Sequence, residues 1–152
     1  MIQRIQSVYF LLAGLFPALL FFLTLLSFEC GGQTYSLSAF SFGVSGQPAL
    51  HTPYGVIVFT VLSTVLPIFT IFKFSNRPLQ IKLAKYTLIL QALLAMTFAV
   101  YAWPFVGDYP QATDFTPGFG LLLWVLAVVF TILAKKSVKR DEDLVRAADR
   151  IR

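Results

Sequence analysis

Few side chains in this 152-residue chain could carry out acid–base or metal chemistry. Imidazole and carboxylate groups bind metal ions and transfer protons, but those present outside the apolar segments match no zinc-binding spacing. We therefore predict no metal and no cofactor. These residues are interpreted as solvated loop side chains, with a His–Glu contact or a small acid–base or metal site as the alternatives. The set comprises Glu29, Cys30, His51, Asp108 and Asp114.

Motifs that bind phosphate or activate a nucleophile are absent from the sequence. There is no Gly-rich phosphate-binding motif and no Gly-x-Ser-x-Gly motif. The four long apolar segments contain no Asp, Glu, Lys, Arg or His. Proton-coupled carriers and pumps need ionisable groups at this depth. We therefore predict that the protein is neither an enzyme nor a carrier driven by protons or charge, and we assign no catalytic residue.

A second set of polar side chains lies inside the apolar segments. Thr60 and Thr64 are four residues apart and therefore share one face of a helix. Gln91 is the only strongly polar residue of its segment. These three residues could bind the headgroup of a lipid or a quinone. The alternative, which we favour, is a hydrogen bond between helices, worth about 0.6–2 kcal/mol in a membrane.

Four long apolar segments must position all of these side chains. Hydrophobic residues make up 57% of the chain and charged residues 12%, whereas about a quarter of the residues of soluble domains are charged. A helix crosses a bilayer with about 20 apolar residues. We predict an all-α membrane protein, a bundle of four transmembrane helices over residues 1–136. The predicted spans are residues 7–28, 54–72, 86–103 and 117–134.

The basic residues determine the predicted orientation. All twelve Lys and Arg residues lie before residue 7, in the polar turn at residues 72–85, or after residue 134. The loops at residues 29–52 and 106–116 contain acidic residues but no Lys or Arg. Because positively charged loops remain in the cytoplasm, the turn and both termini are predicted to be cytoplasmic.

The loop at residues 29–52 contains a strand-like stretch. Polar and apolar residues alternate from Thr34 to Ser38, with the period of two that is typical of a strand. The alternation slips at Ala39 and Phe40 and then resumes, as in a bulged or re-aimed strand. We predict a small hairpin or extended flap over the outer ends of the helices.

Residues 137–152 are predicted to form a charged cytoplasmic helix that continues the fourth span. The segment has no Gly or Pro, and Glu142 and Arg146 are spaced for an ion pair on one helical face. A narrow apolar stripe beside charges of both signs favours docking on a protein; the alternative is a solvated helical extension. The predicted docking residues are Arg4, Arg77, Leu144, Arg146, Ala148, Asp149 and Ile151.

Three polar segments carry a family resemblance. They are the opening MIQRIQSVY, the turn NRPLQIKL and the ending KRDEDLVRAADRIR. In these segments and in its layout, the chain resembles a family of uncharacterised four-pass bacterial inner-membrane proteins, classed only as a domain of unknown function. The resemblance implies a bacterial origin, the inner membrane and four spans. It implies no activity, cofactor or catalytic residue.

These observations lead to one predicted function and one alternative. We predict a non-enzymatic accessory, assembly or scaffold subunit of a bacterial inner-membrane complex. Its predicted partners are membrane lipids and another membrane or cytoplasmic protein. Nucleic acid is not expected, because the net charge of +5 is distributed as in a membrane protein. The alternative is a small carrier or binder of a neutral or lipidic ligand within the helix bundle.

Overall fold

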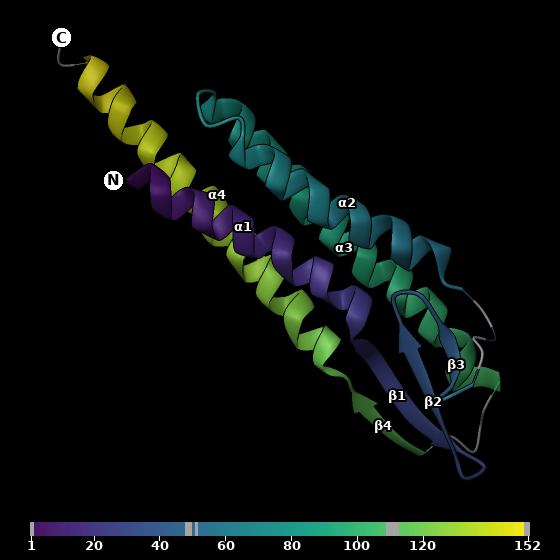
Figure 1. The fold of residues 1–152 in the computed structure, drawn as a ribbon. Coiled ribbons are helices and arrows are strands. Elements are labelled where there is room, and N and C mark those ends of the chain that lie inside the picture. The colour runs from purple at the N-terminus through teal and green to yellow at the C-terminus, as the bar shows by residue number, and fades with distance from the viewer. Residues whose placement is uncertain (1, 48–49, 51, 109–112, 151–152) are drawn as a thin grey trace.

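The computed structural model describes residues 2–47, 50, 52–108 and 113–150, with side chains for residues 5–47, 50, 52–102 and 115–147. In this part of the chain, four helices lie beside one another and a small sheet lies at one end of them (Figure 1). All four are long and apolar enough to cross a membrane, which confirms the predicted set of apolar helices. They are α1 (Ile2–Leu19), α2 (Tyr54–Ile71), α3 (Arg77–Asp108) and α4 (Phe119–Arg150).

The helices form a closed bundle with two different ends. α1 packs against α2 and α4, and α3 packs against the same two helices. The start of α1, the turn between α2 and α3, and the end of α4 lie at one end of the bundle, and the sheet lies at the other (Figure 1). Residues that are far apart in the sequence, at the start, middle and end of the chain, are therefore neighbours in space.

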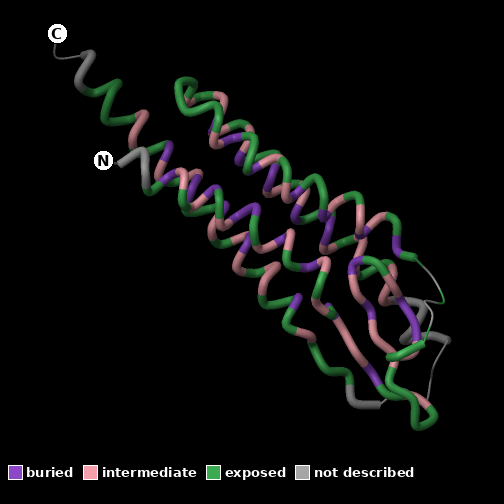
Figure 2. Tube along the Cα trace, in the orientation of Figure 1, coloured by how far each residue is buried: buried purple, intermediate pink, exposed green. Residues whose placement is uncertain are grey.

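Buried and exposed residues alternate along the helices (Figure 2); the buried positions include polar as well as apolar side chains, and many of the exposed positions are apolar. The outer faces of a soluble helical bundle are instead mostly charged and polar. The buried polar residues are Gln6, Thr60, Ser63, Thr70, Gln80, Thr87, Gln91 and Thr131. Large apolar side chains on the outer faces include Val8, Leu11, Leu15, Val58, Val65, Ile89, Met96, Leu122 and Ile132.

The first predicted span, residues 7–28, is wrong at its C-terminal end. The helix begins at Ile2 and ends at Leu19, and a short 3-10 turn, Leu20–Phe22, follows it. The chain then enters a strand, β1 (Thr24–Cys30). A short apolar run has the same appearance in a buried strand and in a helix, and here its pairing with neighbouring strands decides the conformation.

The predicted small hairpin or extended flap is confirmed as an antiparallel sheet, which is larger than expected. β1 pairs with β2 (Gln33–Ser38), and β2 pairs with β3 (Phe42–Val44). Gly31 and Gly32 form the β1–β2 turn with φ values of 60° and 77°, a left-handed conformation that favours glycine. The fourth strand, β4 (Thr113–Pro117), comes from the second loop and pairs with β1, giving the order β3-β2-β1-β4.

The slip in alternation at Ala39 and Phe40 marks a turn between two strands, and of the two predicted alternatives, a bulged or a re-aimed strand, the bulge is wrong. The backbone N–H of Ser38 donates to the carbonyl oxygen of Ser41 at 2.9 Å. The two serine hydroxyl oxygens are also 3.0 Å apart. Serine side chains that bond to nearby backbone groups favour turns, and the chain therefore reverses direction between β2 and β3.

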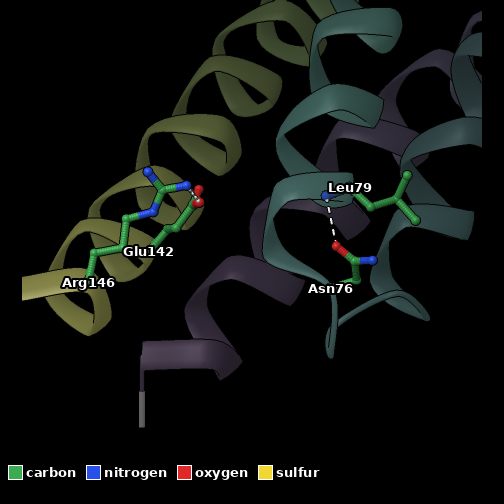
Figure 3. Close-up of polar contacts among 4 residues, drawn as sticks. All are labelled: Asn76, Leu79, Glu142 and Arg146. Atoms are coloured by element: carbon green, nitrogen blue, oxygen red, sulfur yellow. Dashed lines mark hydrogen bonds and ion pairs between the residues drawn. The ribbon is translucent and has the colours of Figure 1, made fainter. Parts of the chain in front are cut away.

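The third and fourth helices are longer than their predicted spans, residues 86–103 and 117–134. α3 begins at Arg77, where the side-chain oxygen of Asn76 accepts a hydrogen bond from the backbone N–H of Leu79 at 3.1 Å (Figure 3). Asn76 therefore caps the helix, and Pro78 is tolerated in its first turn. α4 begins at Phe119, because Pro117 belongs to β4, and it continues without a break to Arg150.

Candidate functional site

The charged end of the bundle brings together the turn between α2 and α3 and the last part of α4. The Nε atom of Arg77 lies 3.1 Å from Oδ2 of Asp141, and both side chains are mostly buried, at 28% and 13% exposure. This ion pair connects the first residue of α3 to α4. Because the pair is partly buried, water screens its attraction less than that of an exposed pair. It therefore holds α3 and α4 together more strongly than an exposed pair would.

A second charged contact, among the described side chains of this end, lies within α4. Arg146 donates to Glu142 at 2.6 Å, one helical turn away (Figure 3). Arg146 is 71% exposed, so the pair stiffens the outer face of the helix and does not attach it to the bundle. Leu144, between them in the sequence, is 54% exposed, and Val145 is 40% exposed.

Two grooves flank this part of α4. The α1–α4 groove has a volume of about 390 Å³ and includes Leu144 in its lining. The turn groove, about 600 Å³, lies between α4 and the α2–α3 turn and includes Val145 in its lining. Two consecutive apolar residues of α4 are therefore available on two different sides of the helix.

The structure describes the side chains of only three of the seven predicted docking residues. Arg77 contacts α4, Arg146 contacts its own helix, and Leu144 is exposed. The side chains of Arg4, Ala148 and Asp149, and the whole of Ile151, lie outside the described residues. Phe74, Lys136 and Arg140 also line the two grooves and were not among the predicted docking residues, because their positions depend on packing between helices.

The predicted polar patch in the bundle is not a single cluster of interacting side chains. Gln91 is fully buried, and its amide nitrogen donates to the hydroxyl of Thr131 on α4 at 3.0 Å. The hydroxyls of Thr60 and Thr64 donate to carbonyl oxygens of their own helix, at 2.6 Å and 2.9 Å. Trp124 donates to the backbone oxygen of Gln91 at 3.1 Å. These contacts favour the interhelical hydrogen bond over the ligand site.

The remaining polar atoms do not create room for a ligand. The side-chain oxygens of Gln91 and Ser63 are buried without a hydrogen-bond partner. Trp124 and Leu94 line an apolar cavity of about 40 Å³, whereas ligand cavities typically have about 300–1,000 Å³. This part of the bundle is therefore better suited to holding α3 and α4 together than to binding a lipid or quinone headgroup.

Removing the hydroxyl of Thr131 is expected to cost more stability than removing the amide of Gln91. Thr131→Val leaves the buried amide of Gln91 with no acceptor, which costs about 1–3 kcal/mol. Gln91→Leu leaves the hydroxyl of Thr131 bonded to the carbonyl oxygen of Ala127, at 2.8 Å. We therefore expect the free energy of unfolding to change by less than about 1 kcal/mol. Thermal unfolding in detergent measures both values.

The control for this comparison is Thr87→Val. Thr87 is equally buried, and its hydroxyl donates only to the carbonyl oxygen of Leu83 in its own helix. It should therefore have a small effect. A greater loss of stability for Gln91→Leu than for Thr131→Val would contradict the proposed role of Thr131 as the acceptor that satisfies Gln91.

The predicted outer set is only partly described. Glu29 is exposed in β1, and Cys30 is a half-buried free thiol. The positions of His51 and the side chains of Asp108 and Asp114 lie outside the described residues. Among the residues that are described, no group of three or more His, Cys, Asp or Glu side chains could hold a metal ion.

The profile of one protein family, described as "Domain of unknown function (DUF4293)", matches residues 2–151. The chain belongs to this family. The match confirms the resemblance to an uncharacterised domain family and covers all four helices and the sheet of this DUF4293 protein. No curated protein and no solved structure matches the chain significantly.

Proposed function

We propose that this DUF4293 protein is a four-span protein of the bacterial inner membrane. We further propose that it acts as a non-enzymatic accessory, assembly or scaffold subunit that docks a partner protein through the end of α4. The exposed apolar pair Leu144 and Val145, on a helix that extends beyond the rest of the bundle (Figure 1), is the observation that carries the docking proposal.

The exposure pattern of the helices supports the membrane location. Their outer faces are apolar, and a bilayer solvates such faces at no cost, whereas water does not. α2 has 18 residues and a length of about 27 Å at 1.5 Å per residue, close to the roughly 30 Å of a hydrocarbon core. The small residues between the helices fit this interpretation, because a side chain at Gly14 would meet Ile68 and the backbone of Thr64.

The distribution of charge supports cytoplasmic termini. The described Lys and Arg side chains lie between Lys73 and Lys85 or after Ala134, all towards the end of the bundle that carries the α2–α3 turn. The sheet at the opposite end carries the acidic residue Glu29 and, in its described strands, no Lys or Arg. By the positive-inside rule, the sheet would face away from the cytoplasm.

The geometry of α4 supports docking on protein. The last part of α4, beyond Ala134, is short, and a short isolated helix is marginal in water. One exposed ion pair adds only about 0–1 kcal/mol of stability. The Arg77–Asp141 ion pair holds α4 to the start of α3. Leu144 and Val145, which follow Asp141 on α4, remain exposed. A partner helix or peptide that packs apolar side chains against Leu144 and Val145 would bury both residues.

Replacing Leu144 by aspartate tests the docking proposal. In native membranes, a photo-crosslinking residue at Ala147 should form an adduct with a second protein, and Leu144→Asp should reduce that adduct at least tenfold. The physical reason is that a carboxylate in a buried apolar contact costs several kcal/mol. The measurement is the adduct band together with the amount of protein inserted in the membrane, which should not change.

The matched control is Lys139→Asp, which introduces the same side chain at an exposed position of the same helix that lines neither groove. It should leave the adduct intact. Equal adduct formation by the wild type and Leu144→Asp would contradict docking through this residue. An adduct formed equally well from Ala92, on the outer face of α3, would indicate random collisions in the membrane.

A further inference from the structure

We propose that the α1–α4 groove binds an anionic phospholipid, with the phosphate held by Lys136 and Arg140. The lipid would occupy the part of this groove lined by Leu133, Lys136 and Arg140, whereas the proposed partner contacts Leu144, the last lining residue along α4. The lipid proposal rests on the proposed membrane location alone, because a phospholipid can reach the groove only from a bilayer. The proposal assigns a ligand class to basic residues that the docking of Leu144 does not use.

The groove has apolar walls and a basic rim. α1 contributes Ile5 and Tyr9, and α4 contributes lining residues at intervals of three and one positions, a spacing that places them on one face of the helix. Leu133 lies at the side of the groove nearest the apolar part of α4. The lining residues from α4 are Leu133, Lys136, Ser137, Arg140, Asp141 and Leu144.

The basic rim has an unbalanced positive charge. Lys136 and Arg140 are exposed and lie one helical turn apart, a rise of about 6 Å. Among the described side chains, neither has a carboxylate within ion-pair distance. Asp141, the only acid among the described lining residues, is already 3.1 Å from Arg77. Two cations are therefore free to receive a phosphodiester, and the Ser137 hydroxyl is a further possible donor.

The location of the groove favours a lipid over a soluble anion. The outer surface of α4 changes from apolar to basic between Leu133 and Lys136, which is where headgroups meet the hydrocarbon core in the proposed orientation. A lipid with its phosphate at Lys136 can extend an acyl chain along Leu133 and Tyr9. A free phosphate would leave this apolar surface uncovered. Basic pockets between transmembrane helices at the cytoplasmic side have this combination of features.

Binding of phosphatidylglycerol by the purified full-length protein tests the assignment. Native mass spectrometry in neutral detergent would compare phosphatidylglycerol with phosphatidylcholine of the same acyl chains. Each basic residue near an anionic lipid contributes roughly fivefold to binding. We therefore expect a preference of roughly 25-fold for phosphatidylglycerol in the wild type, and less than about threefold in the double variant Lys136→Gln/Arg140→Gln.

Two further variants separate the groove from the general charge of this end. Lys82→Gln/Lys85→Gln removes the same charge from exposed positions of α3 that do not line the groove, and it should keep the preference. Ile5→Trp fills the groove and leaves both charges in place, and it should weaken phosphatidylglycerol binding. Both results would support a specific site.

Three results would overturn the proposal. The first is an unchanged preference in Lys136→Gln/Arg140→Gln. The second is an equal loss in Lys82→Gln/Lys85→Gln, which would indicate diffuse attraction to a basic surface. The third is equally tight binding of glycerol 3-phosphate, which would make the ligand a soluble anion. None of these results depends on whether Leu144 docks a partner, so the two proposals can fail separately.

Discussion

Replacing Gly118 by alanine is expected to separate α4 from the sheet and to destabilise the protein by about 3 kcal/mol. A Cβ atom at this position would overlap the backbone carbonyl oxygen of Thr24 and lie 2.8 Å from its carbonyl carbon. The backbone N–H of Gly118 also donates to the carbonyl oxygen of Leu25 at 3.0 Å. Since backbone atoms cannot move aside as a flexible side chain does, the added methyl group must break this junction.

Thermal unfolding in detergent, combined with limited proteolysis of residues 24–44, measures this effect. The expected result is a lower midpoint and faster cleavage of the sheet, with the helices still formed. Ala92→Val is the control, because it adds carbon atoms at an exposed position on the outer face of α3. An unfolding midpoint for Gly118→Ala equal to that of the wild type would show that β1 and α4 do not need this close approach.

An all-or-none difference in labelling is expected between the two ends of the bundle. In a Cys30→Ser background, Gln33→Cys in β2 should react fully with a membrane-impermeant maleimide added to spheroplasts. Ser75→Cys, in the α2–α3 turn, should react only after the membrane is opened. Both positions are exposed, so a difference in reactivity reports the side of the membrane and not burial.

Inverted membrane vesicles are the control for this experiment, because they should reverse the two results. Labelling of Ser75→Cys in intact spheroplasts would contradict the orientation derived from the basic residues. Labelling of both positions in both preparations would contradict insertion of the four helices. The same measurement reports which side of the membrane the α1–α4 groove faces. Asp141 of its lining is paired with Arg77, next to the α2–α3 turn that carries Ser75.

The sequence alone was sufficient to predict the set of four apolar helices and the presence of a flap. The reason is that both depend on patterns local in the chain: long apolar runs without ionisable residues, and an alternation of period two from Thr34 to Ser38. Gln91 could be recognised as a buried polar residue in the same way. Its acceptor, Thr131, is 40 residues away in the chain, and no local pattern identifies such a pair.

Only the tertiary structure decided where the first helix ends and how the sheet is completed. Residues 24–28 are as apolar as the helix before them, and they form a strand because β2 and β4 supply hydrogen-bond partners on both sides. β4 comes from a loop that is 89 residues away from β1, as the Ser27–Thr116 contact shows. The α1–α4 groove has the same origin, since Ile5 and Lys136 meet only when the first and last helices pack. Composition determines which segments avoid water, whereas pairing and packing between distant segments determine which residues share a site.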